Sequence, residues 1–139
     1  MRRAGRLIIA APALAALLLA GCGGAVSDDH EIVEPASFDE QTGRIEMTAQ
    51  ASERLDIQTA PVQARGDLLV VPSAALLVVA DGTFYVYTSP EPLVFVPRPI
   101  SIDRDDGVTA FLTEGPPAGT DVVTVGVPEL YGIQYGMGH

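Results

Sequence analysis

The chain has 139 residues, with 18 acidic residues against eight arginines and no lysine, and its formal net charge is −10. A surface this negative repels polyanions, which excludes DNA and RNA as partners. About 118 residues follow the first 21, enough for one domain with a modest core and little room for a deep enzyme cleft. Cys22 is the only cysteine, so an internal disulfide is excluded as well.

Residues 1–21 are typical of a bacterial lipoprotein signal peptide. Three arginines lie near its start, and an apolar run of about 14 residues follows, too short to cross a bilayer comfortably as a helix. The run ends in residues 19–22 (LAGC), which resemble a lipobox, the site where the cysteine receives a diacylglycerol before cleavage. We therefore expect Cys22 to be lipidated. The alternatives are an ordinary secreted protein and an uncleaved anchor helix.

Lipidation predicts where the mature protein lies. Two or three acyl chains give durable membrane attachment, so we expect a cell-envelope protein that faces the periplasm or the exterior. Loss of the leader would leave five arginines against 18 acidic residues, a net charge of −13. Gly23 follows the cysteine, where an Asp would signal retention, so the outer membrane is favoured in a host with two membranes.

Residues 22–43 are polar, acidic and aperiodic, which predicts a flexible tether. About 20 such residues span about 25 Å as a coil, so the folded part would sit just above the membrane. Residues 28–31 (DDHE) could also be considered a metal site. A solvated acidic linker is the simpler interpretation, because flexible adjacent ligands lack fixed geometry.

Residues 44–135 show the alternation of apolar and polar side chains that is typical of strands. Good helix formers at residues 49–55 predict one short helix. Strands are predicted over residues 57–62, 68–71, 74–79, 84–87, 94–102, 108–112 and 121–125.

Turn signals separate these strands, at residues 65–67, 81–82, 89–92, 105–107 and 115–119. Pro97 and Pro99 fall within the longest predicted strand and must lie at a sheet edge or a bulge, because proline donates no hydrogen bond. Short strands with frequent turns predict an all-β fold, a small antiparallel barrel, sandwich or β-roll with at most one short helix.

An ordered set of segments resembles one known family. These segments are residues 51–62 (ASERLDIQTAPV), 71–77 (VPSAALL), 81–87 (DGTFYVY), 96–100 (VPRPI), 115–126 (GPPAGTDVVTVG) and 128–132 (PELYG). In order and spacing they are similar to the membrane-proximal parts of periplasmic adaptor subunits, also called membrane fusion proteins, of RND-type efflux pumps. The resemblance implies that residues 51–62 and the later stretch, residues 71–126, both contribute strands to one domain that sits against an inner-membrane pump.

The chain also departs from that family. Full adaptors place a β-barrel, a lipoyl-like domain and an α-helical hairpin between the first two segments, where this chain has only residues 63–67. Family members often have Gly at the position of Asp56, which leaves the local backbone conformation there open. Without the hairpin the chain could not bridge to an outer-membrane channel in the usual way. The resemblance therefore implies docking on a pump or on a full-length adaptor.

Candidate partner-binding residues are Arg98 and Arg104, which could make charge-assisted contacts with a partner or pair with nearby Asp residues. The aromatic residues alternate on strands and are expected in the core and its rim: Phe84, Tyr85, Tyr87, Phe95 and Phe111. Met137 and His139 could bind copper or silver, or belong to a frayed C-terminal tail over residues 136–139.

No pattern predicts catalysis. His30 and His139 lie in predicted tails, no serine lies in a nucleophile elbow, and the glycines form no phosphate loop. We expect no enzyme activity, no cofactor and no resident metal. Three interpretations remain: a lipoprotein that docks on an efflux system, a stand-alone envelope module that binds a small ligand or metal ion, and a structural or decaying envelope lipoprotein.

Overall fold

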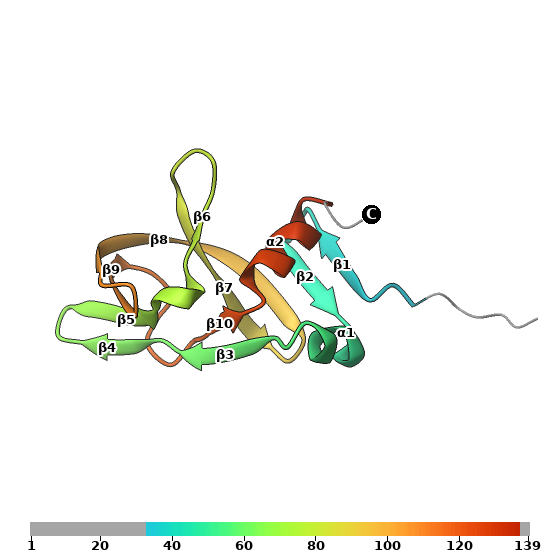
Figure 1. Ribbon diagram of the computed structural model, residues 1–139, viewed down its shortest axis with the longest axis horizontal. Helices are drawn as coiled ribbons and strands as arrows, with labels where there is room; N and C mark the ends of the chain where they lie inside the picture. The colour runs from blue at the N-terminus through green and yellow to red at the C-terminus, as the bar shows by residue number, and fades with distance from the viewer. Residues whose placement is uncertain (1–32, 137–139) are drawn as a thin grey trace, which may run out of the picture. The chain divides into compact units, whose positions relative to one another are not determined.

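The computed structural model describes residues 33–136 (Figure 1). The predicted signal peptide, Cys22, the first half of the predicted tether, and Met137 and His139 lie outside these residues. Within the described part of the chain, no helix is long and apolar enough to cross a membrane.

Strands dominate the described residues. They are β1 (Ala36–Asp39), β2 (Arg44–Met47), β3 (Gln58–Pro61), β4 (Gln63–Arg65), β5 (Leu68–Pro72), β6 (Leu77–Val78), β7 (Phe84–Glu91), β8 (Val94–Asp105), β9 (Thr109–Glu114) and β10 (Asp121–Val125). The helices are α1 (Ala49–Arg54) and α2 (Val127–Gln134), with a 3₁₀ turn at Ser73–Ala75.

The strands form a nearly closed antiparallel barrel in the order β3-β10-β7-β8-β9-β5-β4. The barrel closes because β3 and β4 are two halves of one extended segment: β3 pairs with β10, and β4 pairs with β5. Val62 lies between them and bonds to the loop before β10, through Val62 N–H to Thr120 O (2.8 Å) and Gly119 N–H to Val62 O (2.8 Å). The predicted all-β barrel, and the pairing of the early stretch with the later strands, are confirmed.

The barrel sheet is buried on both faces, which produces two apolar clusters. The inner cluster fills the barrel, with Val62, Val71, Ala75, Val86, Ile100, Ala110, Leu112 and Val122. The outer cluster lies beneath the helices and the β1–β2 hairpin, with Ile45, Met47, Ala51, Tyr87, Phe95, Val123, Val127 and Leu130. Neighbouring residues such as Val86 and Tyr87 point to opposite faces, so both are fully buried.

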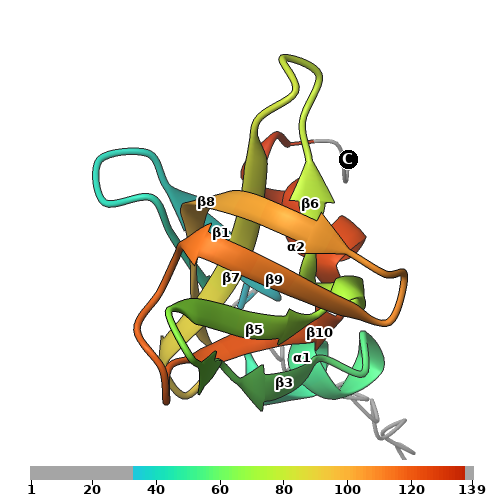
Figure 2. The same ribbon diagram turned by 90° about the vertical axis from the view of Figure 1, so that its left-hand side faces the viewer.

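The long strand β8 connects the two halves of the barrel. Its first residues pair with β2 and its last residues pair with β9, while β7 runs along its other edge (Figure 2). Residues 96–100 have no strand on the side away from β7. Pro97 and Pro99 lie in this stretch, so the prediction that they mark a sheet edge is confirmed.

The β1–β2 hairpin moves the start of the folded part forward. Residues 36–43 were expected to belong to the tether, but Ala36–Asp39 pairs with Arg44–Met47, and Ala36 and Phe38 pack against the outer cluster. Asp39 stabilises the turn, because its Oδ1 accepts the Gln41 N–H at 2.8 Å. The boundary expected at residue 44 is therefore corrected to include this hairpin, whose apolar positions are too few to signal a strand.

Two other local expectations are corrected. The strand expected over residues 74–79 is a 3₁₀ turn followed by the two-residue β6, because the Asp81-Gly82 hairpin turn ends the pairing with β7 early. The turn expected at residues 89–92 lies further on, at Pro92-Leu93, between β7 and β8. Leu93 has φ +63° there, and a type II turn with proline at its first central residue requires a positive φ at the second.

The predicted helix at residues 49–55 is confirmed as α1. Thr48 caps its start by accepting the Ala51 N–H on Oγ1 at 3.1 Å. At its end, Ile57 N–H bonds to Ser52 O and Asp56 N–H bonds to Glu53 O, both at 3.1 Å, the pattern of a Schellman motif. Asp56 has φ +50°, the left-handed conformation that glycine adopts most readily.

Helix α2 is not predicted from the sequence, and it covers the outer cluster. Val127 and Leu130 are buried against the sheet. The Tyr87 hydroxyl donates to Gln134 Oε1 at 2.6 Å, which joins β7 to the end of the helix. Burial raises the pKa of the Tyr87 hydroxyl above its ordinary value, and Tyr135 and Tyr131 nearby raise it further, so this group stays protonated as a donor.

Gly126 joins β10 to α2 at a point where no side chain fits. Its φ is +96°, and a Cβ there would collide with the δ-methyl of Ile57, the residue before β3. We predict that Gly126→Ala lowers the free energy of unfolding by about 2–4 kcal/mol, of which about 1–2 kcal/mol is the left-handed backbone and the rest steric overlap.

Ile57→Val supplies the matched control, because it removes the colliding methyl. In urea unfolding followed by circular dichroism, Gly126→Ala should lower the free energy of unfolding by less in the Ile57→Val background than in the native one. Equal costs in both backgrounds would contradict the contact.

Asp56 provides a second test. We predict that Asp56→Gly is more stable than Asp56→Ala by about 1 kcal/mol, because both lose the carboxylate but only glycine relieves the left-handed backbone. Thermal unfolding of the two variants measures this difference. Equal stability of the two would mean that the helix does not end in the left-handed conformation.

Candidate functional site

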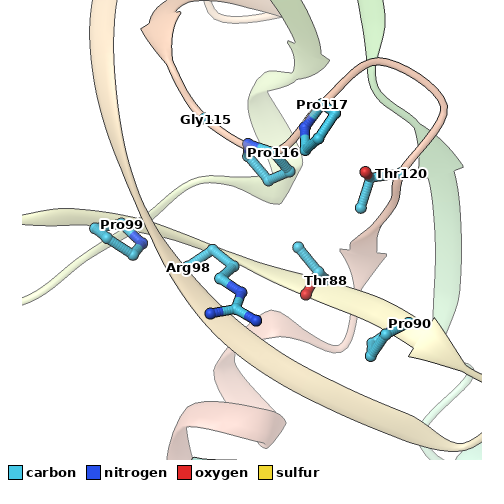
Figure 3. Close-up of a pocket in the computed structure, with 8 residues that line it drawn as sticks. All are labelled: Thr88, Pro90, Arg98, Pro99, Gly115, Pro116, Pro117 and Thr120. Carbon is cyan, nitrogen blue, oxygen red and sulfur yellow. The ribbon is translucent and has the colours of Figure 1, made fainter.

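A hollow of about 480 Å³ opens where β8 has no neighbour on one side (Figure 3). Strands β7 and β8 and the loop between β9 and β10 line it, with Thr88, Pro90, Arg98, Pro99, Gly115, Pro116, Pro117 and Thr120. Arg98 is the one charged residue among them, and half of the lining residues are prolines.

The hollow exists because the pairing of β8 is interrupted. Strand β9 runs beside β8 only from Ser101 onward, and β9 ends at Glu114. The loop that follows turns away through Gly115, Pro116 and Pro117 (Figure 3). Prolines on both sides of the opening provide no backbone N–H, so a further strand could not pair normally with β8 here.

Gly115 brings this loop down onto the barrel. A Cβ at Gly115 would lie 3.1 Å from Leu112 Cδ1 and 3.4 Å from Ile100 Cγ2, both inner-cluster side chains. The loop is also fixed further along, since Thr120 N–H donates to Pro117 O at 3.1 Å. The wall formed by Pro116 and Pro117 is therefore anchored at both ends.

Arg98 lies opposite Val86 in the β7–β8 ladder, on the face that lines the barrel interior. Beyond the end of the inner cluster its side chain is exposed and lines the hollow, and its guanidinium lies to the side of Thr88, away from Pro116 and Pro117 (Figure 3). Among residues 33–136, no carboxylate lies within 4.0 Å of this guanidinium and no hydrogen bond engages it. By contrast Arg44, a partly exposed arginine of β2, pairs with Glu91 at 2.5 Å.

Thr88 is the polar floor of the site. It is the one buried polar side chain of the described residues, and its Oγ1 donates to Val96 O at 3.0 Å. This bond holds the start of β8 against β7 beneath Arg98. Its proton is thereby engaged, so the side-chain donors left to the hollow are Arg98 and the hydroxyl of Thr120.

Arg104, the second candidate residue, lies elsewhere. Its guanidinium carbon is 3.9 Å from the centroid of the Phe111 ring, and its Nη1 is 3.6 Å from an oxygen of Asp103. Arg65 also approaches Phe111, at 5.7 Å. Arg98 and Arg104 share no pocket, so the structure does not bring the two predicted residues into one site.

The turn after Arg104 is held by an ionised carboxylate. Backbone N–H groups of Thr109 and Val108 donate to Asp106, and they hold the pKa of that carboxyl below its ordinary value, with a smaller contribution from Arg104. Asp105 and Asp106 therefore stabilise the β8–β9 turn by accepting backbone N–H groups.

The aromatic residues lie where the sequence predicts. Tyr87, Phe95 and Phe111 are buried, while Phe84 and Tyr85 are partly exposed at the rim. Among residues 33–136, no three His, Cys, Asp or Glu side chains are grouped to hold a metal ion. The residues considered as alternative metal ligands, His30, Met137 and His139, and the predicted lipidation residue, Cys22, lie outside the described residues.

Sequence reasoning found Arg98 but not the hollow around it. The signal was present in four prolines, one near the end of β7, one within β8 and two in the loop after β9, at residues 90, 99 and 116–117. Their convergence depends on the barrel closing, which no local pattern specifies.

Comparisons with family models, with curated proteins and with solved structures find no match for this chain.

The isolation of Arg98 predicts that it contributes little to stability. Arg98→Gln should change the free energy of unfolding by less than about 0.5 kcal/mol. Arg104→Gln should lower it by about 0.5–1 kcal/mol, because the stacking on Phe111 is lost. Urea unfolding of both variants measures these changes. A loss above about 1 kcal/mol for Arg98→Gln would show that it has a structural partner.

Proposed function

We propose that this chain is a membrane-anchored lipoprotein of the cell envelope that docks on a transport complex through protein–protein contacts. The resemblance of its sequence to the membrane-proximal domain of efflux-pump adaptors suggests the partner, either an RND pump or a full-length adaptor. The lipobox at residues 19–22 suggests the anchor.

The observation that carries the proposal is the pairing of β3 with β10. These strands come from the two segments that resemble the adaptor family, and they are about 60 residues apart in the chain. Directly after β3, at the point where an adaptor has its other domains, this chain has only the short β4–β5 hairpin. A membrane-proximal-like unit folded in this way retains a docking surface and has no arm to reach a distant channel.

The exposed arginines support contact with a protein partner. Arg98 has no carboxylate partner among residues 33–136, and Arg104 is held on the exposed side of Phe111. Arginine presents five donors in a rigid fork, and it is enriched at protein interfaces. On a chain with a net charge of −10, such cations are sites where an acidic patch on a partner is tolerated.

Affinity capture of the tagged full-length lipoprotein from its own membranes tests the proposal. We expect enrichment of an RND pump or a full-length adaptor. The Arg98→Gln/Arg104→Gln variant should recover at least about tenfold less of that partner, since each charge-assisted contact contributes about 1.5–3 kcal/mol and the loss of even one corresponds to about tenfold in affinity.

The matched control is Arg44→Gln/Arg54→Gln, which removes the same charge on other exposed surfaces and should capture normally. Cys22→Ser should release the protein from the membrane fraction. Capture of neither a pump nor an adaptor from intact membranes would contradict the docking function, and membrane retention of Cys22→Ser would contradict the lipid anchor.

A further inference from the structure

We infer that the hollow at Arg98 is a binding site for an organic monocarboxylate, a small molecule with one carboxylate on an apolar body. This site is a property of the folded barrel and does not depend on docking to a transport complex.

The charge of the ligand follows from the lining. Arg98 is the one ionised side chain in the hollow, so a cation would meet only repulsion there. Elsewhere in the described chain, Arg44 pairs with Glu91, while Arg104 lies over Phe111 beside Asp103. No carboxylate of residues 33–136 lies within 4.0 Å of the Arg98 guanidinium; Arg54 and Arg65 also form no ion pair there, but neither lines the hollow.

The number of charges follows from the surroundings. Phosphate and sulfate sites in proteins use several cations or a row of backbone N–H groups. Here Pro90, Pro99, Pro116 and Pro117 provide no N–H, and no second cation lines the hollow. The net charge of the chain also repels polyanions. One planar carboxylate matches the single guanidinium fork.

The apolar body follows from the walls and the volume. Pyrrolidine rings make up much of the lining, and they offer an apolar surface for a ring or a short hydrocarbon chain. A volume of about 480 Å³ far exceeds that of a carboxylate and lies within the range of small-molecule sites. The anchored loop after Gly115 keeps this wall in place without a ligand.

The shape of the opening favours a small molecule over an added strand of a partner. A peptide that extended the sheet would need N–H donors and carbonyl acceptors in alternation along β8. Pro97 and Pro99 interrupt that alternation in the unpaired stretch. A small molecule that enters end-on and binds only the Arg98 guanidinium does not need the backbone N–H donors that these prolines lack.

Titration of the mature lipoprotein in lipid nanodiscs tests the site, with 3-phenylpropionate as the probe and 3-phenyl-1-propanol as its neutral counterpart. Isothermal calorimetry measures affinity, and the Nε–H resonance of Arg98 reports location by NMR. We expect saturable binding of the carboxylate that shifts the Arg98 resonance. The affinity for the alcohol should be at least about tenfold lower, because the alcohol cannot form the charge-assisted hydrogen bond.

Variants locate the site. Arg98→Gln should weaken binding of 3-phenylpropionate about tenfold or more, and Arg98→Lys should be intermediate because it keeps the charge and loses the fork. Arg54→Gln, at the exposed end of α1, is the matched control and should leave affinity unchanged.

Three results would overturn the inference: no saturable binding up to about 10 mM, equal affinity for the alcohol, or unchanged affinity in Arg98→Gln. Inorganic phosphate binding as tightly as the carboxylate would overturn the assignment of ligand class. None of these results bears on capture of a pump, so the two proposals fail separately.

Discussion

The pairing of one extended segment, residues 58–65, with two different strands holds this barrel together. Its first half bonds to β10 and its second half to β5, and Val62 at the junction is buried in the inner cluster. Without this segment the sheet would have two open edges, each with unpaired backbone groups. Both the inner cluster and the position of Ile57 against Gly126 depend on this closure.

The hollow at Arg98 results from the same bending of the sheet that closes the barrel. A barrel closes only if its strands bend, and here β8 bends through irregular pairing with β9 at Ser101, Ile102 and Arg104. Residues 96–100 of β8, just before that irregularity, have only β7 as a neighbouring strand, and Pro97 and Pro99 lie in this stretch. The same residues that prevent edge-to-edge pairing also create an apolar wall around Arg98. Protection of the edge and a candidate binding site therefore have one structural origin.

Much of the fold could be predicted from the sequence, because the patterns are local. Asp81-Gly82 predicts its hairpin, the pattern of residues 57–62 predicts β3, and Pro97 and Pro99 predict an edge. The β1 strand and α2 were missed. Phe38 is the one large apolar residue of β1, and Gly132 within α2 weakens its helix signal, although Pro128 in the first turn is a start signal. Tertiary contacts with the outer cluster stabilise both elements.

The site was predictable only in part for the same reason. Arg98 stands out as a cation between prolines, but its isolation from acidic groups depends on which strands lie beside it. Nothing in the sequence indicates that Arg104 differs from Arg98 in this respect. In the structure Arg104 lies over Phe111, because the two residues are opposite each other in the β8–β9 ladder. Cross-strand neighbours decide the difference between the two arginines.

The distance along the chain between β3 and β10 has a kinetic consequence. A strand near residue 58 finds its partner only after residues 121–125 are available, and contacts between segments so far apart make folding slow. Until then the inner cluster lacks Val122, and α2, which follows β10 directly, has no completed sheet to cover. A chain emerging residue by residue from a ribosome or a translocon would therefore stay open almost to its end.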